Sequence, residues 1–393
     1  MNFPFFISAL MLLLHAAESS ATTVGVTYNT MTPDVPPPEH VVPVLQSLKI
    51  SAVRLLNPIP AAVRSFAYTN ISLLLSVPNY LIPSFAANRS AADLWLYSHV
   101  LPYHPRTRIS LISVGSDAIT DVATTYSTLD PSTILLSAMQ NLHLSLRDLG
   151  VHTIRVSTTF SFVEIMTTSF PPSAAEFQEP LSSLILRPLL QFLDETNSSL
   201  LINLYPYNVY RINSEIPIGF ALFQENPFNF RDDVVTGVRY RNLFDMMVDA
   251  VVAAMAVAWQ ENIPVIVTET GWPSEAEPQA AGNYAEMYLK GLVKHLRSGL
   301  GTPLRKEGVT EAYVYQLFDE SDSKYNGSSA NGTYDYASTR ERAGQHWGIM
   351  HPNLTMKFKV DFSASTWILG NDKRLVKVVV RLCASLLSVS LLL

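Results

Sequence analysis

Eight short runs of aliphatic and β-branched residues, separated by stretches of helical sequence, constrain the fold of this chain more than any other feature. Most are bounded by Gly, Pro, Asn, Asp or Ser, as strands usually are. The runs are Thr23 to Tyr28, Ala52 to Leu56, Ser72 to Val77, Ile109 to Val114, Thr153 to Phe160, Leu200 to Tyr205, Ile263 to Glu269 and Glu311 to Phe318. Strands that alternate with helices build parallel sheets. Eight such units predict a single α/β domain with the architecture of a (β/α)8 TIM barrel.

The segment from Asn242 to Glu261, between the sixth and seventh runs, is almost continuously apolar and has two interpretations. A membrane span needs about 20 consecutive apolar residues. Asp245 and Asp249 interrupt this segment four residues apart, on one side of a helix. The two acids therefore favour a helix that packs on the barrel.

The N-terminal end of the chain has the pattern of a secretory signal. An apolar stretch from Phe3 to Leu14 is followed by small residues at the positions that signal peptidase reads. We predict a signal peptide at residues 1–21 and the barrel domain at residues 22–362; a buried strand or helix is the alternative for the first segment. Six Asn-x-Ser/Thr sequons are compatible with passage through the secretory pathway. Their asparagines are Asn70, Asn88, Asn197, Asn326, Asn331 and Asn353.

The C-terminal end has the three parts of a glycosylphosphatidylinositol (GPI) signal. Small residues from Ser363 to Ser365 precede a spacer and an apolar tail from Leu375 to Leu393. We predict that residues 363–393 form this signal, that a lipid is attached at Ser363, and that the segment after the attachment residue is removed. We therefore expect the protein on the outer face of the plasma membrane. A spanning helix is disfavoured because Lys377 and Arg381 interrupt the tail. Gly370 and Asn371 are further candidate attachment residues.

Composition narrows the classes of ligand. The net charge is −6 and no long Lys/Arg run is present, whereas nucleic-acid binding needs a basic surface. The one cysteine, Cys383, lies in the predicted tail, so we expect no disulfide and no disulfide-rich carbohydrate-binding module. The nine histidines do not form a cluster with zinc-site spacing, and glycine-rich phosphate loops are absent, so no metal or cofactor is expected. A neutral ligand and a monomeric protein fit best.

Two carboxylates stand at the ends of two predicted strands. Glu269 follows the run Val265 to Val267 and precedes a turn at Gly271, while Ser116 and Asp117 follow the fourth run. In TIM barrels the carboxyl ends of the strands carry the functional groups. Two carboxylates in such positions predict cleavage of a glycosidic bond.

Other polar and aromatic residues fall at the same strand ends. Aromatic faces and many hydrogen-bonding groups are what a sugar-binding groove needs. The alternative is that aromatic residues such as Tyr207 and Phe318 only fill the mouth of the barrel. The residues are Tyr28, Asn57, Asn79, Asp117, Asn203, Tyr205, Tyr207, Glu269, Trp272, Phe318 and Glu320.

Several ordered motifs resemble one known family. They are VTETGWPS at Val267 to Ser274, NLYPY at Asn203 to Tyr207, FDMMVDA at Phe244 to Ala250, GTPL at Gly301 to Leu304, and Phe318 to Glu320. From about Thr23 to Phe362 the chain resembles plant glycoside hydrolase family 17, the endo-β-1,3-glucanases. The resemblance implies a TIM barrel that cleaves a laminarin-like or callose-like β-1,3-glucan on the cell-wall side of the membrane.

The resemblance also implies roles for single residues. Glu269 is expected to be the nucleophile of a retaining double displacement, and Asp117 stands at the position of the acid/base. Lys324 follows Glu320 by four residues where the family has three, which weakens its assignment. The expected substrate-binding residues are Tyr28, Asn79, Ser116, Asn203, Tyr205, Phe318, Glu320 and Lys324.

The acid motif departs from the family pattern, because Val-Gly-Asn-Glu is replaced by Val114, Gly115, Ser116 and Asp117. An Asp lacks one methylene group and withdraws its carboxyl by about 1.5 Å. Retaining enzymes hold their carboxyl groups ~5–5.5 Å apart, so a shorter acid widens the pair. Two alternatives to an active glucanase follow: a surface glucan-binding protein with weak or no turnover, and a transglycosylase.

Overall fold

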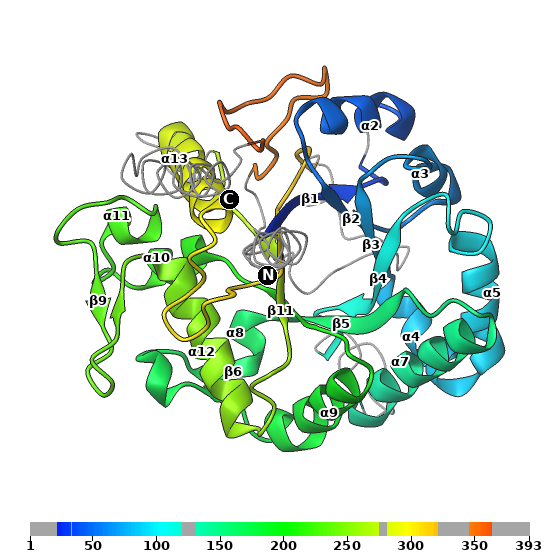
Figure 1. Ribbon diagram of the computed structural model, residues 1–393, viewed down its shortest axis with the longest axis horizontal. Helices are drawn as coiled ribbons and strands as arrows, with labels where there is room; N and C mark the ends of the chain where they lie inside the picture. Colours follow the sequence, from blue (N-terminus) through cyan, green and yellow to red (C-terminus); the bar gives the residue numbers. More distant parts are fainter. Residues whose placement is uncertain (1–21, 33, 120–130, 275–280, 321–345, 364–393) are drawn as a thin grey trace, which may run out of the picture.

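The computed structural model describes residues 22–32, 34–119, 131–274, 281–320 and 346–363. Eight parallel strands close into one barrel in the order β1-β12-β11-β8-β5-β4-β3-β2 (Figure 1). The strands are β1 (Thr23–Asn29), β2 (Ala52–Leu56), β3 (Ser72–Val77), β4 (Ile109–Ser116), β5 (Arg155–Ser161), β8 (Leu200–Asn203), β11 (Val265–Thr270) and β12 (Glu311–Val314). The predicted (β/α)8 barrel is confirmed.

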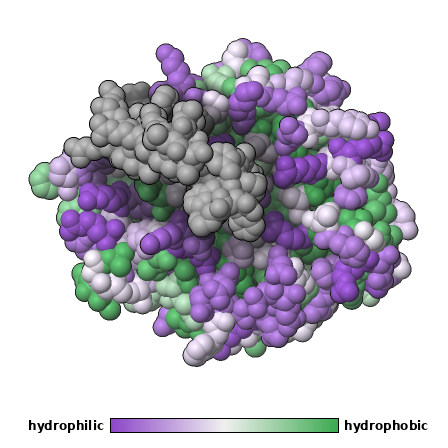
Figure 2. All heavy atoms as spheres, viewed as in Figure 1, coloured by the Kyte–Doolittle hydropathy of each residue, from purple (hydrophilic) through white to green (hydrophobic). Residues whose placement is uncertain are grey.

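Helices form a ring around the barrel (Figure 1). The longer ones are α2 (Pro38–Ser47), α3 (Pro60–Ser65), α4 (Ile82–Ala87), α5 (Arg89–His99), α7 (Pro131–Asp148), α9 (Arg187–Glu195), α10 (Pro206–Ile212), α12 (Leu243–Val257) and α13 (Ala281–Arg297). The shorter helical elements are η1 (Asn79–Leu81), α8 (Phe162–Ile165), η2 (Pro172–Ala174), η3 (Ser182–Leu186) and α11 (Ile218–Ala221). Two small hairpins pair β6 (Met166–Thr168) with β7 (Glu176–Phe177) and β9 (Arg231–Asp232) with β10 (Arg239–Tyr240). Hydrophilic side chains cover much of the outer ring in the view of Figure 2, so the apolar faces of these helices are largely turned toward the strands.

Two strands end earlier than the sequence predicts. β8 ends at Asn203, not Tyr205; Leu204 N still donates to Glu269 O, and Pro206 begins α10 after Tyr205. β12 ends at Val314, not Phe318. Beyond Val314 the backbone leaves the regular ladder but still donates hydrogen bonds to its neighbours, from Tyr315 N to Thr270 O and from Leu317 N to Thr27 O.

The inside of the barrel changes from apolar to polar along the strands. One interior layer is apolar except for the hydroxyl of Tyr313, and Gly25 leaves room for the ring of Tyr313, since a Cβ at Gly25 would lie 2.7 Å from Cδ1 of that ring. This layer comprises Ala52, Leu74, Leu111, Leu201, Ile266 and Tyr313. Side chains two positions further along a strand point to the same face. The next layer toward the carboxyl ends therefore holds Arg54, Ser76, Ser113, Asn203 and Thr268, all at most 1% exposed.

Helix α12 packs on the barrel, and among the described residues no helix is long and apolar enough to cross a membrane. Both of its acids are buried. Asp245 Oδ1 lies 2.7 Å from Nε2 of His295, while Asp249 accepts hydrogen bonds from Thr302 Oγ1 at 2.5 Å and from the Leu304 backbone N–H at 2.9 Å. The two carboxylates thus fasten α12 to α13 and to the loop that follows it.

Replacing Asp249 by Asn is expected to change how stability depends on pH. Burial raises the pKa of the Asp249 carboxyl to about 6, against 3.8 for the ordinary group, although hydrogen bonds from Thr302 and Leu304 oppose the shift. Between these pH values the folded protein keeps a proton that the unfolded chain has lost, so stability falls as pH rises through this window. The amide introduced by Asp249→Asn would carry no charge and could keep both contacts. We expect the free energy of unfolding of Asp249→Asn at pH 7 to rise by up to about 3 kcal/mol, measured by urea unfolding at pH 4 and pH 7.

The control for this experiment is Asp194→Asn on the exposed side of α9. It removes one carboxylate without removing a buried charge. The free energy of unfolding of this variant should therefore depend on pH as it does in the parent protein. A parallel profile for Asp249→Asn as well would contradict the assignment.

Candidate active site

The backbone at the end of β4 is shaped to deliver Asp117. Gly115 and Asp117 both adopt left-handed conformations, with φ of 79° and 49°, and the ladder with β5 shifts register between Ser113 and Ser116. Asp is among the residues that tolerate this region. Gly115 suits its φ of 79°, and a Cβ there would also lie 2.7 Å from Cδ1 of Ile82 and 2.8 Å from Oδ1 of Asn79. The ladder between β11 and β8 shifts register before Glu269. Irregular pairing thus marks both strand ends that carry a predicted catalytic carboxylate.

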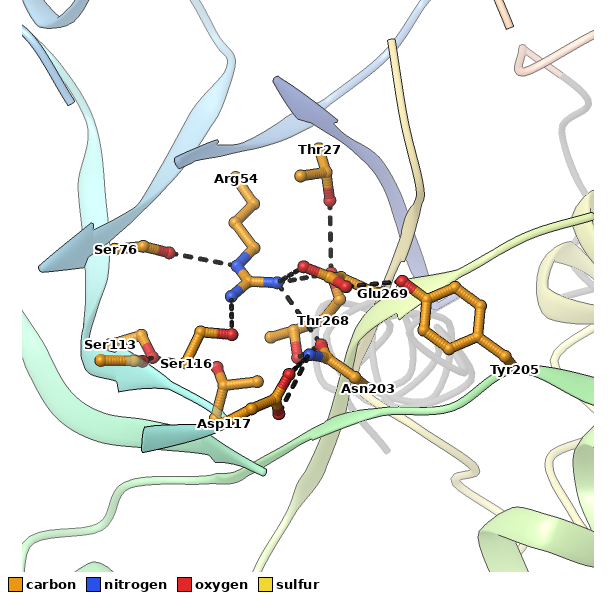
Figure 3. Close-up of polar contacts among 12 residues, drawn as sticks. Thr27, Arg54, Ser76, Ser113, Ser116, Asp117, Asn203, Tyr205, Thr268 and Glu269 are labelled. Carbon is orange, nitrogen blue, oxygen red and sulfur yellow. Dashed lines mark hydrogen bonds and ion pairs between the residues drawn. The ribbon is translucent and has the colours of Figure 1, made fainter. Parts of the chain in front are cut away.

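Glu269 is held by an ion pair inside the barrel. Its Oε1 accepts a hydrogen bond from Nη1 of Arg54 at 2.7 Å, and the two side chains are 2% and 0% exposed. Its Oε2 accepts from the Tyr205 hydroxyl at 2.5 Å (Figure 3). Both carboxylate oxygens therefore have strong donors, which fixes the plane of the group.

The guanidinium of Arg54 organises the polar layer around it. Nε donates to Ser76 Oγ at 3.1 Å and Nη2 donates to Ser116 Oγ at 3.0 Å, while Nη1 also lies 3.4 Å from the Thr268 carbonyl oxygen (Figure 3). A planar guanidinium fits such a set of fixed acceptors better than an ammonium group does. Arg54 therefore connects β2 to β3, β4 and β11.

Asn203 joins the two carboxylates into one network. Its Nδ2 donates to Asp117, at 3.0 Å to Oδ2 and 3.3 Å to Oδ1. Its Oδ1 accepts from Thr268 Oγ1 at 2.9 Å and from Arg54 Nη1 at 3.4 Å. Because donors surround the oxygen and a carboxylate faces the nitrogen, these partners determine the orientation of the amide. The path from Asp117 to Glu269 thus runs through Asn203 and Arg54.

Asn79 lies beside the acid motif rather than beside Glu269. Its Oδ1 accepts from the Ser116 backbone N–H and its Nδ2 donates to the Ser116 carbonyl oxygen, both at 2.9 Å. This two-ended contact fixes the peptide that precedes Asp117. In the structure the predicted substrate residue Asn79 therefore supports the acid-bearing backbone.

The remaining predicted site residues lie on β1 and after β12. The rings of Tyr28 and Phe318 meet edge to face at 6.0 Å and are 1% and 3% exposed. Burial and the charge of Glu39 raise the pKa of the Tyr28 phenol to about 12, so it remains protonated. Glu320 Oε1 accepts from Nδ2 of Asn29 at 3.3 Å. Tyr28 and Phe318 therefore pack against each other, and Glu320 is tied to the end of β1.

Several predictions concern positions away from this site. Lys324, Asn326 and Asn331 lie outside the described residues. Among the described sequon asparagines, all four are exposed: Asn70, Asn88, Asn197 and Asn353. Ser363 is also exposed, and its hydroxyl donates to Asp361 Oδ1 at 2.6 Å. No group of three or more His, Cys, Asp or Glu side chains within the described ranges is placed to hold a metal ion.

Sequence reasoning missed Arg54. The available signal was a lone charged residue in the apolar run Ala52 to Leu56, at a position whose alternation directs it into the barrel. Ser76 and Thr268 occupy equivalent inward positions and carry no distinguishing pattern of their own.

Comparison with known proteins gives consistent similarities. The model of the family described as glycosyl hydrolases family 17 matches residues 24–362. The chain is 33% identical over 368 residues to glucan endo-1,3-beta-glucosidase 13 of Arabidopsis thaliana, covering 92% of this chain and 68% of that protein. It is 35% identical to glucan endo-1,3-beta-glucosidase 2 of the same plant, covering 89% and 66%. Among solved structures, the β-1,3-glucanase CJP38 of Cryptomeria japonica pollen has a TM-score of 0.75 at 30% identity, covering 87% of this chain and all of that one.

Proposed function

The chain belongs to glycosyl hydrolase family 17, and on that premise we propose that it hydrolyses internal linkages of a β-1,3-glucan. The observation that carries this proposal is the network that joins Asp117 on β4 to Glu269 on β11 through Asn203 and Arg54. The names of the relatives, glucan endo-1,3-beta-glucosidases and a β-1,3-glucanase, supply the substrate class.

The proposed mechanism is a double displacement that retains the anomeric configuration. Glu269 attacks the anomeric carbon while Asp117 donates a proton to the departing oxygen, which releases one part of the glucan. Asp117 then takes a proton from water, and that water displaces Glu269 from the sugar. Arg54 and Tyr205 keep the nucleophile oriented, so little reorganisation is needed at the moment of attack.

The acid is the weak point of this mechanism. Asp117 has a shorter side chain than the Glu of the family pattern, and Asn203 Nδ2 already lies near both of its oxygens. The hydroxyl of Ser116 accepts from Arg54, where the family pattern has an amide. A well-placed general acid contributes about 10²–10⁴ in rate, so this site should work below the rate of a Glu-bearing homologue.

Substitutions at Asp117 test the proposal. Asp117→Asn cannot donate a proton as a carboxylic acid and should lower kcat on laminarin by about 10²–10⁴. Asp117→Glu moves the carboxyl outward by about 1.5 Å and should raise kcat above that of the parent. The measurement is the release of reducing ends by the purified protein, with Asp93→Asn on α5 as the control. Full activity in Asp117→Asn would show that another group is the acid.

A second candidate function is glucan binding with little turnover. Ser116 and Asp117, the two residues that differ from the family pattern, favour this function because both are hydrogen-bonded to neighbouring side chains. Tight binding of laminarin by the parent protein, without reducing-end release and without a gain in Asp117→Glu, would establish this function.

We further propose a monomeric barrel domain at residues 22–362 that reaches the cell surface by a signal peptide at residues 1–21 and is held there by a lipid attached at Ser363. The exposure of Ser363 and of four sequon asparagines supports this location. Release from intact cells by a phosphatidylinositol-specific phospholipase tests the anchor, and a Ser363→Pro variant shows whether this residue carries it.

A further inference from the structure

Trp347 lies next to the residue that holds the proposed nucleophile. Its indole packs against three tyrosines, with ring centroids 5.2 Å from Tyr205, 5.7 Å from Tyr207 and 6.2 Å from Tyr315. Tyr205 is the residue whose hydroxyl donates to Glu269 Oε2. Trp347 is 3% exposed, and its carbonyl oxygen accepts from the Gln316 backbone N–H at 3.2 Å, which ties it to the end of the barrel.

The orientation of the indole follows from its contact with Gly271. A Cβ at Gly271 would lie 3.4 Å from Cε3 and 3.6 Å from Cζ3 of Trp347. Both carbons belong to the six-membered ring and lie on the edge remote from Nε1. The carbon edge therefore faces the turn after Glu269, and the N–H edge is directed away from it.

The N–H of this indole is an unused donor. Nε1 of Trp347 is buried, and within the described structure no acceptor lies at hydrogen-bond distance from it. An indole N–H can only donate, and leaving it buried without a partner costs free energy. Buried donors of this kind are rare and call for an explanation. A phenyl ring would preserve much of the contact with the tyrosines without that cost.

We propose that Trp347 is a substrate-binding residue, whose N–H donates to a hydroxyl oxygen of the glucosyl unit bound beside Glu269. A neutral sugar offers such acceptors, and the indole lies beside Tyr205, the residue that donates to the proposed nucleophile. This inference rests on the proposed function, because it requires a glucan in that place.

Trp347→Phe tests the proposal, because it keeps an aromatic ring against the three tyrosines and removes the donor. We expect kcat/KM on laminarin to fall about tenfold, mainly through a higher KM, as for the loss of one hydrogen bond between uncharged groups. The matched control is Trp95→Phe on α5, where the indole is 5% exposed and stacks on His99 at 4.7 Å. This control should leave the kinetics unchanged and show what the loss of an indole does to Tm.

The outcomes separate this inference from the proposed function. An active parent whose Trp347→Phe variant keeps kcat/KM within twofold would make the indole N–H structural and overturn the inference alone. With a parent that releases no reducing ends, binding decides: affinity for laminari-oligosaccharides should be about tenfold weaker in Trp347→Phe. Equal affinities, or no binding by the parent, would overturn it. If Trp347→Phe does not fold, the ¹⁵N indole resonance of Trp347 in Glu269→Gln must shift when the oligosaccharide is added, and an unmoved resonance would refute the contact.

Discussion

Glu269→Gln should abolish glucan hydrolysis and leave the barrel folded. A Gln side chain has the same shape, so its Oε1 can accept from Arg54 while its Nε2 donates to the Tyr205 oxygen, a hydroxyl able to reverse its role. The amide cannot form the glycosyl ester at a useful rate. Loss of a covalent nucleophile typically lowers kcat by about 10⁴-fold or more.

Three measurements on this variant belong together. Reducing-end release reports kcat, calorimetry on laminari-oligosaccharides reports affinity, and thermal unfolding reports the fold. We expect loss of the first, retention of the second, and cooperative unfolding at a lower Tm, because the amide leaves the buried charge of Arg54 without its counterion. Glu261→Gln, at an exposed position just before β11, controls for the loss of a carboxylate. Activity within tenfold of the parent would remove Glu269 from the role of nucleophile.

The second large effect is expected from Arg54→Met. Methionine is unbranched and fits the space of the arginine stem, but it leaves Glu269 buried without its cationic partner. Breaking a buried ion pair from one side typically costs about 3–5 kcal/mol. The free energy of unfolding should fall by that amount in urea titrations, and kcat should fall as well, because Glu269 loses one of its two fixed donors.

Two further variants identify the physical cause of that loss. Arg54→Lys keeps the charge, but its ammonium group cannot reach Ser76, Ser116 and Glu269 together. Its free energy of unfolding should therefore lie between those of the parent and Arg54→Met. Arg54→Met combined with Glu269→Gln removes both charges and should be more stable than Arg54→Met alone. Additive effects in this double-mutant cycle would show that the ion pair is not what Arg54 contributes.

The fold was accessible from the sequence because the strands of a parallel barrel are buried on both sides and read as short apolar runs. β2 and β3 begin and end at the predicted residues. β12 was predicted four residues too long, because the stretch Tyr315 to Phe318, apolar apart from Gln316, remains buried after the ladder ends. Apolar sequence reports burial, and burial continues where regular pairing stops.

The site was predictable only in part. Glu269 and Asp117 stand out because each ends an apolar run. The partners of these carboxylates depend on distances across the barrel, between residues as far apart as Arg54 and Glu269, and no local pattern encodes them. Asn79 shows the same limit, since its position at a strand end was evident while its two contacts with the Ser116 peptide were not.

The buried cation described above also bears on the second half of the proposed reaction. When Glu269 becomes an ester, its negative charge disappears, and Arg54 is left facing a neutral group inside a layer of hydroxyl and amide oxygens. A buried positive charge that has lost its counterion raises the free energy of the glycosyl-enzyme. It also stabilises the carboxylate that departs when water attacks. The arginine that positions Glu269 for attack therefore also favours the later release of Glu269 from the sugar.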